Sequence, residues 1–121
     1  MPEQQNNEFW GHLDRLIANS QVVIDRPKDS VHTDYEDMIY PLDYGYLAGT
    51  TSSDGAGIDV WLGSSGEHDV RGVVCTVDLV KRDAEIKLLL GCTDTEMQTI
   101  VRFLNDNQGM RCYLVRRNGI A

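Results

Sequence analysis

Four aspartates occur in two pairs, and both pairs have the same spacing of five residues. Asp54 and Asp59 lie at the two ends of a glycine-rich segment, and Asp78 and Asp83 bracket a connection between two predicted strands. Glycine lets a loop fold back on itself, so the carboxylates of the first pair can face one point. Carboxylates held close together repel each other unless a cation or proton intervenes, and Mg²⁺ prefers such oxygen ligands. The pattern predicts a Mg²⁺ site formed by the four aspartates. The alternative is that they are solvated acids of surface loops.

The tyrosines are concentrated just before the first aspartate pair. Three of the five lie within a short segment, at Tyr40, Tyr44 and Tyr46. A tyrosine ring combines a rigid apolar body with a polar tip, which suits hydrogen bonding to an anion. The alternation of Tyr44 and Tyr46 is equally typical of one face of a strand. Lys87 follows Asp83 by four residues within a predicted strand, where its ammonium either extends to solvent or points into the acidic cluster.

The charge balance limits the partners that this chain can have. Its 121 residues carry 11 Lys and Arg against 19 Asp and Glu, which gives a net charge of −8 at pH 7. Nucleic-acid binding needs a basic surface, so we expect no nucleic-acid partner. No apolar run approaches the roughly 20 residues of a membrane helix, and the N-terminus does not resemble a signal peptide. We therefore expect a cytoplasmic protein with no membrane partner.

The periodicity of apolar residues predicts an α+β, mainly β protein with a single domain over residues 1–121. We expect an amphipathic helix over residues 7–19, after a polar segment, residues 1–6, that is expected to be disordered. A second helix begins after Thr93, because Thr93 and Glu96 form the capping-box pattern. β-branched or alternating segments predict the strands, which fall at residues 22–24, 38–40, 58–62, 70–79, 85–90 and 110–115. This inventory fits a small OB-like barrel, closed or nearly closed, with helical cover.

The central segment resembles the signature of the soluble family I inorganic pyrophosphatases. That family has YP-x-[N/D]-YGY followed by D-G-D-x-x-D-V, and this chain has YPLDYGYL followed by SSDGAGIDVWL. The flanking segments VVIDRP and VDLVKRDAEIKLL are similar to the family's first strand and to its D-x4-D segment. The resemblance extends in the family's order from Gln21 to Leu104, and the chain is identified as a minimal, divergent member.

The resemblance implies an OB-like five-stranded barrel with an N-terminal and a C-terminal helix. It also implies Mg²⁺-dependent hydrolysis of inorganic pyrophosphate to phosphate, in which two metal ions activate a water. The carboxylates that match the family's metal ligands are Asp54, Asp59, Asp78 and Asp83. The residues that match its catalytic groups are Asp59, Tyr44 and Lys87. The residues expected to bind substrate are Tyr44, Lys87, Tyr40 and Lys28. Family members often assemble, so the resemblance also implies a homo-oligomer.

The sequence departs from the family pattern at positions that matter for catalysis. Where the family has the middle aspartate of DGDxxD, this chain has Ala56, whose methyl group neither binds Mg²⁺ nor accepts a proton. The family's hairpin between residues 27 and 40, with its phosphate-binding lysine and arginine, is shortened or missing, and Arg26, Lys28 or His32 would have to compensate. We therefore predict a pyrophosphatase of reduced activity, or a hydrolase of another phosphoanhydride. The alternative is a non-catalytic module that binds Mg²⁺ and a phosphate compound, or a partner protein.

Overall fold

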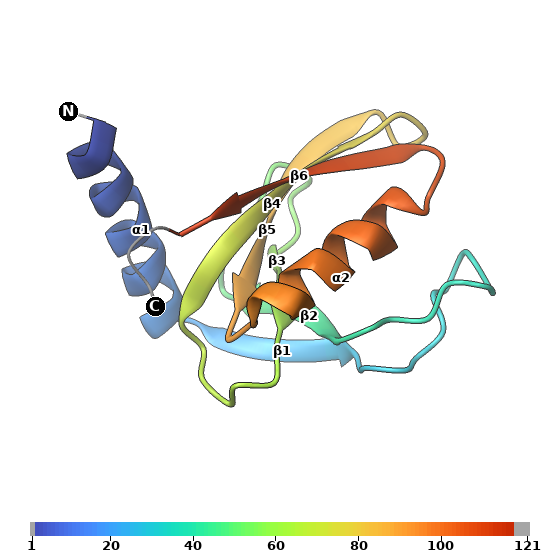
Figure 1. Ribbon diagram of the computed structural model, residues 1–121, viewed down its shortest axis with the longest axis horizontal. Coiled ribbons are helices and arrows are strands. Elements are labelled where there is room, and N and C mark those ends of the chain that lie inside the picture. The colour runs from blue at the N-terminus through green and yellow to red at the C-terminus, as the bar shows by residue number, and fades with distance from the viewer. Residues whose placement is uncertain (1, 118–121) are drawn as a thin grey trace.

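A computed structural model describes residues 2–117 and shows a six-stranded sheet with a helix against each face (Figure 1). In chain order the elements are α1 (Pro2–Ala18), β1 (Gln21–Arg26), β2 (Asp43–Ala48), β3 (Ile58–Leu62), β4 (Val70–Asp78), β5 (Asp83–Leu90), α2 (Asp94–Asn105) and β6 (Met110–Arg116). The order across the sheet is β1-β2-β3-β5-β4-β6, and all neighbours are antiparallel except β3 and β5. In Figure 1, α2 lies between β6 and the β1–β2 pair, and α1 stands near one end of the sheet.

The α+β, mainly β prediction is confirmed, although the sheet has six strands instead of five. Within residues 2–117 it is open, because β1 and β6 each pair on one side only. The predicted strand at residues 38–40 is wrong, because Ile39 forms only an isolated bridge with Val31. Strand β2 at Asp43–Ala48 takes its place, and the sequence pattern does not predict it because Pro41 and Gly45 are typical of turns. Gly45 faces Ile24 beside a β-bulge in β1, and a Cβ atom on Gly45 would lie 1.8 Å from the carbonyl oxygen of Val23. Glycine at this position therefore permits the close approach of two backbones.

Helix α1 starts earlier than the sequence pattern predicts, whereas helix α2 starts where it is predicted. Helix α1 begins at Pro2, so residues 2–6, predicted as disordered, lie within a helix, and Met1 lies outside the described residues. Helix α2 begins as predicted. The hydroxyl of Thr93 accepts from the Glu96 N–H at 3.1 Å, and the Glu96 carboxylate accepts from the Thr93 N–H at 2.9 Å. This reciprocal capping box satisfies two donors that a helix N-terminus would otherwise leave free.

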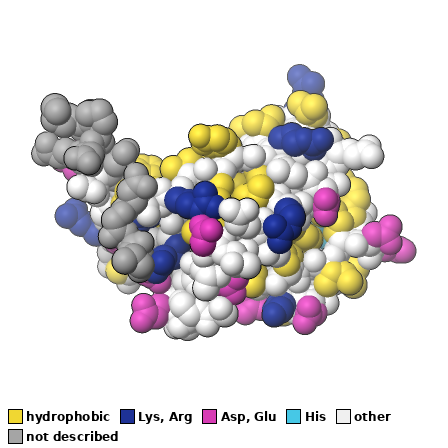
Figure 2. All heavy atoms as spheres, in the orientation of Figure 1, with side chains coloured by type: hydrophobic (Ala, Val, Ile, Leu, Met, Phe, Trp, Pro, Cys, Tyr) yellow, Lys and Arg dark blue, Asp and Glu magenta, His cyan; other side chains and the backbone are white. Residues whose placement is uncertain are grey.

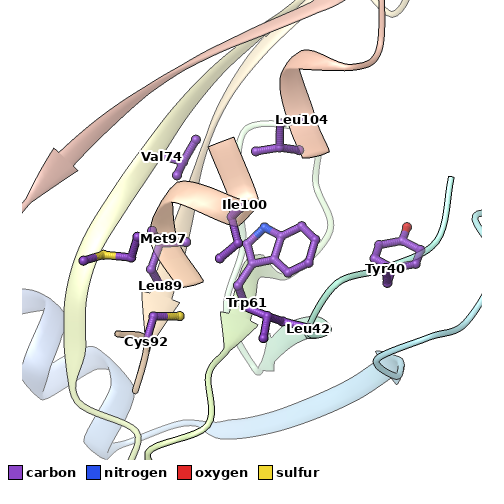
Figure 3. Packing of buried hydrophobic residues seen from close by; sticks show 9 residues of the cluster. All are labelled: Tyr40, Leu42, Trp61, Val74, Leu89, Cys92, Met97, Ile100 and Leu104. Atoms are coloured by element: carbon purple, nitrogen blue, oxygen red, sulfur yellow. The ribbon is translucent and has the colours of Figure 1, made fainter. Parts of the chain in front are cut away.

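The sheet separates two hydrophobic clusters. Side chains alternate between the faces of a strand, so Leu88 and Leu90 pack on the α1 side and Leu89 packs on the α2 side. The α2-side cluster consists of Tyr40, Leu42, Trp61, Val74, Leu89, Cys92, Met97, Ile100 and Leu104. Figure 3 shows Trp61 in the middle of this cluster, next to Ile100. The α1-side cluster consists of Trp10, Ile17, Leu47, Val60, Val70, Val73, Leu88 and Leu90.

Two consecutive arginines at the C-terminal end of β6 connect the sheet to both helices. The Arg116 side chain forms an ion pair with Asp94 at the start of α2. The Arg117 guanidinium binds both carboxylate oxygens of Asp14 in α1, at 2.8 and 2.9 Å, and lies 5.8 Å from the centre of the Trp10 ring. Exposed ion pairs contribute little singly, but the bidentate geometry and the aromatic contact fix how α1 meets the sheet.

The surface on the α2 side mixes both signs of charge. Figure 2 shows Lys and Arg side chains interspersed with Asp and Glu side chains on this face. None of the helices within residues 2–117 combines the length and the apolar character needed to cross a bilayer.

The cysteines differ in burial, and we expect them to differ in reactivity. Burial raises the pKa of the Cys92 thiol to about 12, whereas Cys75 is exposed. Because the thiolate is the reactive form, a thiol reagent at pH 8 should modify Cys75 first and Cys92 only after unfolding. Peptide mapping by mass spectrometry over a time course measures this order. Cys75→Ser serves as the control that removes the fast phase, and rapid labelling of Cys92 in the native protein would contradict the packing of the α2-side cluster.

Candidate functional site

The register of the sheet places several polar side chains on the α2 face, beside the apolar cluster. Asp59 precedes Trp61 by two residues in β3, and Lys87 precedes Leu89 by two residues in β5. Because side chains alternate along a strand, each polar residue projects from the same face as the core residue that follows it. Tyr44 lies opposite Trp61 in the β2–β3 pair and joins the same face. Tyr44, Asp59 and Lys87, which are far apart in sequence, thus lie together beside the core.

These side chains line a cavity of about 340 Å³ that contains both signs of charge. Its carboxylates are those of Asp25, Asp34, Asp54, Asp59 and Glu85. Its basic residues are Arg26, Lys81 and Lys87, together with His32. Its rings come from Tyr40, Tyr44, Tyr46, Trp61 and Phe103. Such a lining suits a ligand that combines a cation with an anion, because each part meets groups of opposite charge.

A larger hollow lies between α1 and the opposite face of the sheet. It measures about 520 Å³ and is lined largely by apolar side chains, among them Phe9, Ile58 and Ile86. Within residues 2–117, Glu85 is the one charged residue in its lining. Of these two cavities, the smaller one therefore holds most of the charged groups.

A hydrogen-bonded chain of three side chains forms one wall of the cavity. Lys87 Nζ donates to Asp59 Oδ2 at 2.8 Å and to the Tyr44 hydroxyl at 2.9 Å. Lys87 is only 6 % exposed, and its ammonium also lies 5.4 Å from the centre of the Tyr44 ring. Burial raises the pKa of Tyr44 far above its usual value, and the charge of Asp59 raises it further. Tyr44 therefore stays protonated and can donate a hydrogen bond, while Lys87 carries a positive charge into a sheltered position.

Asp54 reaches the cavity from the loop between β2 and β3. Its Oδ1 accepts from the Ser52 hydroxyl at 2.5 Å and from the Ala56 N–H at 2.9 Å. These hydrogen bonds, that of Ser52 above all, hold the pKa of the Asp54 carboxyl below its usual value. Ala56 itself is exposed and lies outside the cavity lining. The structure thus brings Asp54 and Asp59 to one cavity, as the sequence predicts.

The second aspartate pair lies elsewhere, at the end of the β4–β5 hairpin. Asp78 and Asp83 face each other across the hairpin, and neither lines the cavity. Asp78 is 5 % exposed, and its Oδ1 accepts from the N–H groups of Val80 at 2.9 Å and Lys81 at 3.1 Å. Asp83 Oδ1 is buried without a hydrogen-bond partner. The predicted cluster of four aspartates is therefore not assembled, and no group of three or more potential ligands is poised for a metal ion within the described residues.

The two further residues expected to bind substrate occupy different positions. Tyr40 lines the cavity and stacks on Tyr44, with ring centres 5.5 Å apart. Lys28 lies outside the lining, and its backbone N–H donates to Asp43 Oδ1 at 2.8 Å. A ligand in the cavity would therefore contact Tyr40 but not Lys28.

The segment between residues 27 and 40 folds back on itself as a short hairpin, with an isolated bridge between Val31 and Ile39. The Tyr40 N–H donates to the Ser30 carbonyl at 2.9 Å, and the His32 N–H donates to the Met38 carbonyl at 2.8 Å. This pairing stacks the His32 ring on Tyr40, with centres 5.6 Å apart and planes 4° apart. His32 is therefore part of the cavity wall.

The sequence pattern does not single out Glu85. It precedes Lys87 by two residues in β5, and this spacing is the signal that places both side chains on one face. Burial raises the pKa of Glu85, Lys87 opposes this shift, and the charges of Asp59 and Asp54 add to it. Glu85 therefore belongs to a crowded group of carboxylates, which a cation would stabilise.

Two further basic residues line the cavity. Arg26 comes from the end of β1, and Lys81 comes from the β4–β5 turn. Burial lowers the pKa of His32, and although Asp34 opposes this, the positive charges of Arg26 and Lys81 lower it further. No sequence signal indicates Lys81, because only the tertiary fold brings the β4–β5 turn next to the 27–40 hairpin.

Comparison with known proteins gives matches by structure and none by sequence. No protein-family model matches the sequence, and no curated protein matches it. The structure is similar to an inorganic pyrophosphatase from Coxiella burnetii (TM-score 0.55, 14% identity, 79% of this chain and 84% of that chain). It is also similar to the inorganic pyrophosphatase of Helicobacter pylori (0.56, 17%, 82% and 84%) and to a protein described as an inorganic phosphatase from Anaplasma phagocytophilum (0.54, 17%, 78% and 81%). These likenesses agree with the motif resemblance, and the chain has the fold of the inorganic pyrophosphatases.

Proposed function

We propose that this protein hydrolyses pyrophosphate, or a related phosphoanhydride, in a Mg²⁺-dependent reaction of reduced efficiency. The observation that carries the proposal is the hydrogen-bonded chain of Asp59, Lys87 and Tyr44 on the wall of a cavity with both signs of charge. The pyrophosphatase fold supports it, because three solved structures with that fold are described as acting on pyrophosphate or phosphate.

The carboxylates of the site fit Mg²⁺ in their chemistry. Asp54, Asp59 and Glu85 share one cavity, and their mutual repulsion contributes to the raised pKa of Glu85. Hard carboxylate oxygens are the ligands Mg²⁺ prefers, so Asp54, Asp59 and Glu85 would hold the ion. When bound, Mg²⁺ would neutralise phosphate oxygens and lower the pKa of the attacking water.

The protein's own side chains supply positioning and proton transfer. The Lys87 ammonium and the Tyr44 hydroxyl bind phosphate oxygens, which holds phosphorus in line with the attacking water. As Lys87 turns toward the phosphate, the Asp59 carboxylate is free to accept a proton from the water. The water oxygen then bonds to phosphorus while the bridging P–O bond breaks, and the second phosphate leaves with the electron pair of that bond.

Ala56 stands where the family pattern has a second carboxylate, so Asp59 is left as the one proposed proton acceptor, which would account for the reduced efficiency. Removing a general base from an enzyme lowers its rate by about 10²–10⁴. We expect Ala56→Asp to raise kcat for pyrophosphate with Mg²⁺ by about ten- to a hundredfold. The side chain is exposed, so the substitution should leave the fold unchanged. A phosphate-release assay measures the gain, with Ala56→Asn as the matched control that adds the same volume without a basic oxygen.

Loss-of-function variants complete the test. Asp59→Asn should abolish phosphate release in both the natural chain and the Ala56→Asp variant. If neither chain releases phosphate from pyrophosphate, the proposed reaction is wrong. If Ala56→Asn gains as much as Ala56→Asp, the missing carboxylate is not the cause of low activity.

A further inference from the structure

Arg26 and Lys81 are two positive charges that face the cavity without an acidic partner. Both line it, and neither forms an ion pair in the part of the chain that the structure describes. Lys87, which comes from β5, is already engaged by Asp59 at 2.8 Å. A protein with a net charge of −8 has abundant carboxylates, yet none is bonded to these two side chains. Their free donors are thus available to a ligand.

The two charges lie close enough to act on the same group. Both lower the pKa of His32, whose ring stacks on Tyr40. Arg26 also opposes the rise that burial causes in the Tyr40 pKa. Like charges gathered at one wall repel each other, and a bound anion would relieve this repulsion. Charge-assisted hydrogen bonds from lysine and arginine to phosphate are among the strong polar contacts in proteins.

Asp78 determines where Lys81 lies. Its buried carboxylate accepts from the Val80 and Lys81 N–H groups, which closes the four-residue turn between β4 and β5. Arg82, the next residue, adopts the left-handed conformation with φ of 59°, and the chain then enters β5. Aspartate commonly caps turns in this way, by hydrogen bonding to backbone N–H groups two or three residues further on.

We infer that Arg26 and Lys81 bind the phosphate group farther from Lys87, and that Asp78 is a positioning residue that holds Lys81 in place. The inference rests on the proposed function, because it assigns anion-binding residues within the same cavity. A diphosphate carries several negative charges, and Lys87 alone neutralises one. Arg26 and Lys81 bring two more charges from other elements, the end of β1 and the β4–β5 turn, so they can bind the phosphate that Lys87 does not hold.

Calorimetric titration with methylenediphosphonate, a non-hydrolysable diphosphate, in the presence of Mg²⁺ tests the assignment. Lys81→Met and Arg26→Met should each weaken binding by about tenfold, as expected for one lost charge-assisted hydrogen bond. Arg82→Met is the matched control, because it removes the same charge from the neighbouring exposed position, which does not line the cavity. Equal weakening by Arg82→Met would overturn the assignment, since it would show a general charge effect.

Two substitutions at Asp78 separate positioning from metal binding. In Asp78→Asn the amide oxygen still accepts both N–H groups, so diphosphonate and Mg²⁺ binding should stay within twofold of the natural chain. Asp78→Ala should weaken diphosphonate binding as much as Lys81→Met. If Asp78→Asn abolishes Mg²⁺ binding, Asp78 is a metal ligand and its positioning role is wrong. Should Asp78→Ala fail to fold, Asp78→Asn and Lys81→Met still decide the question.

The outcomes also distinguish this inference from the proposed function. If the natural chain binds diphosphonate through Arg26 and Lys81 but releases no phosphate, the inference holds and the hydrolysis proposal fails. If it releases phosphate and Lys81→Met binds as tightly as before, hydrolysis stands and the inference fails. A natural chain that binds no diphosphonate overturns both.

Discussion

Replacing Gly45 with alanine is expected to lower the free energy of unfolding by about 3 kcal/mol or more, because the added Cβ would meet backbone atoms. That Cβ would lie 1.8 Å from the Val23 carbonyl oxygen and 2.8 Å from the Ile24 Cα. Backbone atoms cannot rotate aside, so β1 would have to move away from β2 and lose its pairing. Urea denaturation followed by tryptophan fluorescence measures the change, since Trp10 and Trp61 are both buried.

Gly11→Ala provides the matched control for this prediction. A Cβ at Gly11, within helix α1, would have no neighbouring atom within 4 Å. Alanine favours the helix over glycine, so this variant should gain about 0.5–1 kcal/mol. If Gly45→Ala were as stable as the natural chain, the close approach of β1 to β2 would be incorrect.

Replacing Lys87 with methionine is expected to abolish phosphate release and to lower stability by about 2 kcal/mol. The ammonium would be lost from a position 6 % exposed, and Asp59 and Tyr44 would both lose their donor. Removing one partner of a sheltered ion pair leaves the other charge uncompensated, which costs more than the pair itself contributes. Phosphate release and urea denaturation are the two measurements.

The double variant Asp59→Asn/Lys87→Met separates the two effects. It removes both charges, so it should recover most of the lost stability but none of the activity. Recovery of phosphate release in the double variant would show that neither residue takes part in the reaction. Equal stability of the single and double variants would show that the uncompensated carboxylate is not the source of the loss.

The sequence allowed the local elements of the fold to be predicted better than their pairing. The capping box at Thr93 and the alternation along β3, β4 and β5 depend on neighbouring residues, so they are visible in the sequence. Strand β2 was missed because Gly45 is typical of turns, whereas here it is required by the backbone of another strand. The parallel pairing of β3 with β5 likewise depends on contacts between distant segments.

In the candidate site, too, the sequence shows the features that depend on neighbouring residues but not those that depend on contacts between distant segments. The equal spacing within the two aspartate pairs suggested a shared metal site. In the structure, the first aspartate of each pair closes a turn: Asp54 accepts from the Ala56 N–H, and Asp78 accepts from the Val80 N–H. The common spacing therefore reflects, at least in these two aspartates, the turn chemistry that aspartate favours. The contributions of Glu85 and Lys81 depend on the tertiary fold.

The two arginines at the end of β6 have a consequence for the order of folding. Asp14 and Arg117 are 103 residues apart in sequence, so their contact closes a loop that includes nearly the whole described chain. Contacts of such high sequence separation form late, because their loop-closure entropy is compensated only when the intervening structure is in place. During synthesis, α1 leaves the ribosome first but meets Arg117 only after the last strand has been made. Helix α1 should therefore acquire its hydrogen-exchange protection after the sheet, in the final step of folding.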